Sequence, residues 1–88
     1  MDLKKITAEI ADDLDFLKTF TATPGNGCTR MPFTRETRDA AEYLKKIMKE
    51  AGLEVREDCV GNIFGVLPGK DRSLPCIMAG SHYDSVYN

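Results

Sequence analysis

The 88-residue sequence has little excess of either charge, no long apolar run and no apolar leader. Twelve Lys and Arg residues against fourteen Asp and Glu residues give a net charge of −2, which excludes a strongly basic nucleic-acid-binding protein of the usual kind. No apolar run reaches the roughly 18 residues that a membrane-spanning helix needs. The charged N-terminal residues leave no signal-peptide core. We therefore expect a cytoplasmic protein that binds neither nucleic acid nor a membrane.

Paired cysteines are absent as well. The three cysteines, Cys28, Cys59 and Cys76, are widely spaced and form no C-x-x-C pair. Small secreted proteins pair their cysteines in disulfides, so this pattern is typical of reduced thiols inside a cell. Nothing in the spacing indicates a zinc site built from these cysteines and His82.

Two segments have the periodicity of amphipathic helices. Apolar residues three and four positions apart predict a helix over residues 2–20, whose stripe comprises Leu3, Ile6, Ile10, Leu14 and Leu17 and is widened by Phe16 and Phe20. A second helix is predicted over residues 35–51, with Thr34 as its N-cap and Gly52 as the residue that ends it. The loop before it carries Met31 and Phe33, which we expect to pack as a staple to this helix.

Strand patterns follow the second helix. Residues 53–59 and 62–67 are predicted to form an antiparallel hairpin around the turn signal Gly61-Asn62. The continuously apolar run over residues 74–80 predicts a strand that is buried on both faces. Such a strand needs neighbours and covering helices that 88 residues hardly supply. We therefore expect the α/β class and the first part of a larger α/β domain.

Residues 80–85, Gly-Ser-His-Tyr-Asp-Ser, form the one cluster whose residue types clearly indicate a chemical role. They follow the predicted buried strand, where open α/β sheets place their ligand sites. Residues i and i+2 of an extended segment point the same way, so His82 and Asp84 can converge on one point. An imidazole binds zinc readily, and a nearby carboxylate can orient the ring or help to polarise a bound water.

Less specific interpretations compete with this one. A His-x-Asp pair occurs by chance in many proteins as a surface pair, and near neighbours on an extended strand rarely form a hydrolase triad such as His82, Asp84 and Ser85. Cys28 has no second histidine to activate it, so a free thiol is the simpler interpretation. Three arginines are candidates for anion binding, but a solvated loop and helix start is the favoured interpretation of Arg30, Arg35 and Arg38.

Four motifs occur in a fixed order at residues 27–34 (GCTRMPFT), 48–55 (MKEAGLEV), 61–65 (GNIFG) and 80–86 (GSHYDSV). Together they resemble the start of the zinc-dependent amidohydrolases of the peptidase M20 family, in the branch of N-carbamoyl-L-amino-acid hydrolases and allantoate amidohydrolases. The resemblance implies an α/β/α catalytic domain of the zinc-peptidase type with an inserted dimerisation domain. Residues 1–88 are then an incomplete N-terminal portion of the catalytic domain, without the dimerisation domain.

The resemblance also implies roles for two residues of the last motif. His82 matches the first metal-ligating histidine of the family, and Asp84 matches the catalytic carboxylate that orients this ligand. The family uses two metal ions per site (Zn²⁺, or Mn²⁺ or Co²⁺) and hydrolyses small ureido or amide substrates such as N-carbamoyl-L-amino acids and allantoate. One histidine and one carboxylate fall short of the roughly three protein ligands of a catalytic zinc. We therefore expect the isolated chain to be inactive and to bind no metal tightly.

Alternatives within and outside this enzyme class stay open. A zinc aminopeptidase of the M28 type also contains a Gly-x-His-Tyr-Asp-Ser run, so a fragment of an M20 or M28 aminopeptidase or deacylase is the second hypothesis. A free-standing interaction protein without catalytic activity is the third. A buried strand near the end of the chain would leave an apolar edge open, from which we expect a homo-oligomer.

Overall fold

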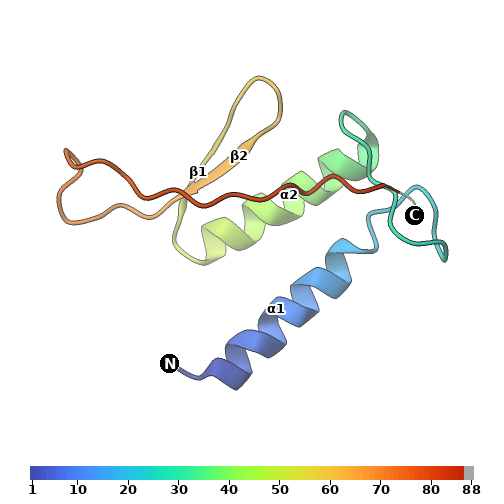
Figure 1. Cartoon of the computed structure of the whole chain (residues 1–88), viewed down its shortest axis with the longest axis horizontal. Coiled ribbons are helices and arrows are strands. Elements are labelled where there is room, and N and C mark those ends of the chain that lie inside the picture. The colour runs from blue at the N-terminus through green and yellow to red at the C-terminus, as the bar shows by residue number, and fades with distance from the viewer. Residues whose placement is uncertain (87–88) are drawn as a thin grey trace. The chain divides into compact units, whose positions relative to one another are not determined.

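The computed structural model describes residues 1–86 and contains two helices followed by a two-stranded antiparallel sheet. The elements are α1 (Leu3–Leu17), α2 (Arg35–Glu50), β1 (Glu54–Glu57) and β2 (Ile63–Val66), in that order along the chain (Figure 1). The chain divides into two compact units. The first comprises Met1–Ala40 and the chain from Tyr83 onward, and the second comprises Ala41–His82. These elements confirm the predicted α/β class.

Helix α1 begins at a polar cap and ends near its predicted position. The Asp2 carboxylate accepts a hydrogen bond from the Lys5 amide at 3.1 Å, which satisfies one of the amides left without a partner at a helix start. Beyond Leu17 the chain continues in a tighter turn, in which the Phe20 amide donates to the Leu17 carbonyl at 3.2 Å. No side chain of α1 is buried. Leu3, Ile10 and Leu14 of the predicted apolar stripe are more than half exposed, whereas Leu17 is half-buried.

Helix α2 confirms both of its predicted ends. The Thr34 hydroxyl accepts from the Thr37 amide at 3.4 Å, and Glu36 lies in the first turn, where a negative charge suits the helix dipole. Gly52 adopts φ +88°, the left-handed conformation that commonly terminates a helix. The buried apolar side chains of the described part of the chain are Ala40 and Ala41, both in this helix.

The predicted staple in front of α2 is wrong. Met31 is 47% exposed and Phe33 is 87% exposed, so neither side chain packs as a staple does. The entry to α2 is held by hydrogen bonds instead, because the hydroxyls of Thr34 and Thr37 both donate to the Met31 carbonyl oxygen. Phe33 itself takes φ +64°.

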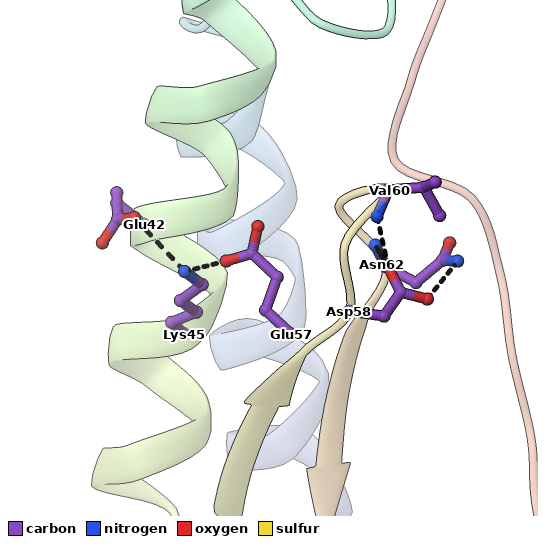
Figure 2. A network of polar contacts seen from close by, with 6 residues as sticks. All are labelled: Glu42, Lys45, Glu57, Asp58, Val60 and Asn62. Carbon is purple, nitrogen blue, oxygen red and sulfur yellow. Dashed lines mark hydrogen bonds and ion pairs between the residues drawn. The ribbon is translucent and has the colours of Figure 1, made fainter.

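The predicted hairpin is confirmed. Strands β1 and β2 pair antiparallel from Glu54 opposite Val66 to Glu57 opposite Ile63. The turn between them is closed by Asp58, whose carboxylate accepts from the Asn62 amide at 2.8 Å and from its side-chain amide at 2.7 Å (Figure 2). These hydrogen bonds lower the pKa of Asp58, because they favour the ionised carboxylate.

An ion pair joins α2 to the hairpin. Figure 2 shows the Lys45 ammonium between the carboxylates of Glu42 and Glu57. The side chains of Lys45 and Glu57 are only 18% and 26% exposed, so water screens this pair less than a fully solvated one. The hydrogen bond to Glu57 is the main reason why the pKa of Lys45 is raised.

The predicted buried strand at residues 74–80 is wrong. These residues form no strand within the described chain, and the large side chains of Leu74, Ile77 and Met78 are 65%, 102% and 75% exposed. Figure 1 shows the segment as part of a long trace without an arrow. A strand exists only through hydrogen bonds to a neighbouring strand, and the described residues offer this segment no such partner.

Candidate functional site

Residues 83–85, which include the candidate residue Asp84, are anchored to the loop after α1. Arg30 and Ser85 form an isolated antiparallel bridge. The Arg30 amide donates to the Ser85 carbonyl at 2.8 Å, and the Ser85 amide donates to the Arg30 carbonyl at 2.9 Å. The residue after Asp84 is therefore held at both of its main-chain polar groups.

The Arg30 side chain reinforces this anchor. It is 7% exposed, and its Nε donates to the Tyr83 carbonyl oxygen at 2.6 Å. Its Nη1 donates to the carbonyls of Leu17 at 2.7 Å and Phe20 at 3.3 Å, at the end of α1, and lies 3.5 Å from Cys28 Sγ. One guanidinium thus connects the end of a helix with the segment that contains Asp84.

The loop that presents Arg30 is braced by its own hydroxyl groups. Thr21 Oγ1 accepts from the amides of Thr23 at 3.1 Å and Thr29 at 2.9 Å. The Ala22 amide donates to the Thr29 carbonyl at 2.8 Å, so the two ends of the loop are joined directly before Arg30. Short hydroxyl side chains are suited to this work, because they satisfy loop amides that no secondary structure satisfies.

The sequence alone does not reveal this role, because it predicts that Arg30 lies in a solvated loop. One local signal points to it in retrospect. The last turn of α1 contains no basic residue, although its carbonyl groups attract a cation. The other two arginines differ from Arg30: Arg35 pairs loosely with Asp39 at 3.9 Å through a side chain that is 90% exposed, and Arg38 is exposed.

The two predicted site residues lie near this anchor in sequence. His82 is exposed and is the last residue of the second unit, whereas Asp84 is half-buried and belongs to the first. Within residues 1–86 no group of three or more His, Cys, Asp and Glu side chains is arranged to hold a metal ion. His82 and Asp84 have the right chemistry for part of a metal site, but two donors do not complete one.

The remaining candidates supply no further chemistry. All three cysteines are free thiols, with Cys28 half-buried and Cys59 and Cys76 exposed. Ser85 contributes its main chain to the bridge with Arg30.

Among residues 1–86, neither helix has the length and apolar character that a membrane span requires.

Similarity to known proteins covers the whole chain. No family model matches the sequence. An N-carbamoyl-L-amino-acid amidohydrolase of Paenarthrobacter aurescens is 47% identical over 89 residues, which are 100% of this chain and 21% of that protein. A ureidoglycolate hydrolase of Arabidopsis thaliana is 40% identical over 88% of this chain, and an allantoate amidohydrolase of Escherichia coli K12 is 38% identical over 90%. The chain thus spans 21% of the Paenarthrobacter protein, 16% of the Arabidopsis protein and 19% of the Escherichia protein.

A solved structure agrees with these sequence matches. The crystal structure of AtUAH in complex with (S)-hydroxyglycine superposes with a TM-score of 0.87 at 39% sequence identity. The superposition covers 91% of this chain and 19% of that one. This fold is therefore shared with part of a much longer chain.

Proposed function

Because the chain belongs to the N-carbamoyl-L-amino-acid and allantoate amidohydrolase branch of the peptidase M20 family, we propose that residues 1–88 form the N-terminal portion of the catalytic domain of a ureido amidohydrolase. The observation that carries the proposal is the match over the full chain at 47% identity. Relatives named for N-carbamoyl-L-amino acids, allantoate and ureidoglycolate share one reaction class, hydrolysis of a non-peptide C–N bond. The proposed substrates are small ureido compounds of this kind.

The proposed chemistry assigns one role to each of two residues. His82 is a metal ligand through its imidazole, and Asp84 is the catalytic carboxylate that orients this ligand. The metal is zinc, manganese or cobalt, two ions per site, since imidazole and carboxylate groups serve all three. The remaining ligands lie outside the described residues, so the isolated 88-residue chain is inactive and binds no metal tightly. A zinc titration of this chain tests the last point, and tight stoichiometric uptake would contradict it.

The same proposal includes a location and an oligomeric state. The protein is cytoplasmic, and the isolated 88-residue chain is a homo-oligomer. Support for the oligomer comes from the uncovered apolar side chains of Leu74, Ile77 and Met78, since monomeric proteins rarely expose such groups together. Light scattering tests it, and a sharp monomer mass at high protein concentration would contradict it.

The decisive experiment compares substrates and variants. It uses the protein expressed from its complete natural gene. Ammonia release is measured with an N-carbamoyl-L-amino acid, allantoate and ureidoglycolate, and release of the free amino acid is measured separately with aminoacyl amides and N-acyl amino acids. We expect ammonia from at least one ureido compound. Turnover of an aminoacyl amide or an N-acyl amino acid, with no ammonia from any ureido compound, would instead support an aminopeptidase or deacylase. No turnover of any compound would support a non-catalytic interaction protein.

Two variants test the proposed residues. We expect Asp84→Asn to lower kcat about 100-fold, as the loss of a group that orients a metal ligand does. His82→Ala is expected to lower metal affinity as well as kcat. Asp12→Asn is the matched control, because it makes the same chemical change at an exposed position of α1. Equal activity of Asp84→Asn and Asp12→Asn would overturn the assignment.

A further inference from the structure

We propose that Arg30 is a positioning residue that sets the direction of the Asp84 side chain. The proposal rests on the proposed function of Asp84, and it explains why a cation is buried at this place. Arg30 is 7% exposed, and charged side chains are rarely buried so far without partners. Its observed acceptors are main-chain carbonyl oxygens and one sulfur atom. The carbonyl acceptors lie at or just after the end of α1, in Leu17 and Phe20, and directly before Asp84, in Tyr83.

Arg30 contacts both peptide groups that flank Asp84, one through its side chain and the other through its main-chain carbonyl. The peptide group before Asp84 contains the Tyr83 carbonyl, which accepts from Arg30 Nε at 2.6 Å. The peptide group after Asp84 contains the Ser85 amide, which donates to the Arg30 carbonyl at 2.9 Å. Peptide groups are planar, so holding both planes leaves the two backbone dihedral angles of Asp84 little freedom. The direction of its Cα–Cβ bond follows from these angles.

The side-chain part of this hold needs a guanidinium group rather than an ammonium group. Its donors form a planar fork, so Nε can reach Tyr83 while Nη1 reaches the carbonyls of Leu17 and Phe20. The carbonyl groups at the end of α1 carry the partial negative charge of the helix dipole, which favours the cation there. A lysine keeps the charge but offers a single nitrogen, so it cannot hold the end of α1 and Tyr83 in the same geometry.

The test uses Arg30→Lys and Arg30→Met in the protein purified as its gene encodes it. Arg35→Lys and Arg35→Met are matched controls, because the Arg35 side chain is 90% exposed. Three quantities are measured: the far-ultraviolet circular dichroism, the hydrogen exchange rate of the Ser85 amide without added metal, and kcat and KM on the ureido substrate.

For Arg30→Lys we expect wild-type helix content and a Ser85 amide that exchanges at least about tenfold faster. We also expect kcat to fall about 10- to 100-fold, the range seen when groups that orient metal ligands are replaced, with KM changed less than about threefold. Arg30→Met is expected to lose more activity than Arg30→Lys, so the conservative variant rescues in part. The Arg35 variants are expected to match the wild type in all three quantities.

Two results would overturn the proposal. One is an Arg30→Lys protein with wild-type exchange at Ser85 and wild-type kcat. The other is a loss of activity that only follows the loss of folded protein, with kcat per folded molecule unchanged, since this describes a structural role alone. If the wild-type protein hydrolyses no ureido compound, the proposed function fails, and the exchange rate of Ser85 in Arg30→Lys still decides whether Arg30 holds the segment around Asp84.

Discussion

Replacing Gly52 by alanine isolates the contribution of backbone conformation at the junction of α2 and β1. Gly52 has φ +88°, and a Cβ added there meets no atom within 4 Å, so the substitution introduces no clash. The left-handed conformation costs an L-residue about 1–2 kcal/mol. The smaller entropy of the unfolded alanine chain offsets about 0.4–1 kcal/mol of this cost. The expected net loss in local stability is therefore about 1 kcal/mol, which corresponds to about fivefold faster exchange of the amides that Gly52 helps to hold.

Amide hydrogen exchange read by NMR is the appropriate assay, because the helix end is closed by two specific hydrogen bonds. The Gly52 amide donates to the Lys49 carbonyl and the Leu53 amide donates to the Met48 carbonyl, both at 3.0 Å. Leu53 therefore reports the opening of this turn.

Two control substitutions separate the causes. Gly52→Asn is expected to lose less than half as much stability, because asparagine tolerates the left-handed conformation. Gly69→Ala is expected to change little, since Gly69 is equally uncrowded and has no positive φ. Unchanged exchange at Leu53 in Gly52→Ala, or equal effects of all three substitutions, would refute the reasoning.

Two further expectations concern the hairpin. The pKa of Asp58 is lowered from 3.8 by its hydrogen bonds, so its contribution to hairpin stability is present above pH 3.8 and is lost as the pH falls through the lower folded-state pKa. Amide exchange at Asn62, corrected for the intrinsic pH dependence, is expected to show this acid limb, and an identical limb in Asp58→Asn would contradict the assignment. Removing the ammonium in Lys45→Gln is expected to speed exchange in β1 about two- to fivefold. Lys46→Gln is the control, because the Lys46 side chain is 70% exposed. An equal effect of this substitution would exclude a specific role for the Lys45–Glu57 pair.

The elements that the sequence predicts correctly are those whose signals are local. Thr34 and Gly52 mark the ends of α2 because a cap and a left-handed residue each act within one turn of the helix. The hairpin follows from Gly61, which has φ +91° in a short turn, and from the β-type residues on either side. Such features require only residues a few positions apart, so a single sequence contains them.

Apart from the local staple at Met31 and Phe33, the misses depend on partners that are distant in the chain. The apolar run at 74–80 has the composition of a buried strand, but burial requires neighbours that the described residues lack. Arg30 contacts Tyr83 across 53 positions of sequence, and no local pattern encodes that contact. The candidate site shows both cases at once: the sequence alone identifies His82 and Asp84, whereas the group that fixes the backbone of Asp84 emerges only from the fold.

The central claim, a metal-dependent hydrolase of ureido compounds, is tested most directly by ammonia release before and after metal depletion. The protein is purified as its gene encodes it, assayed on N-carbamoyl-L-amino acids, allantoate and ureidoglycolate, treated with a chelator, and assayed again after addition of Zn²⁺, Mn²⁺ or Co²⁺. We expect ammonia from at least one substrate, loss of this activity on chelation, and recovery with at least one of the three metals. Ammonia release that is unaffected by complete metal removal, or no release with any substrate and metal, would contradict it.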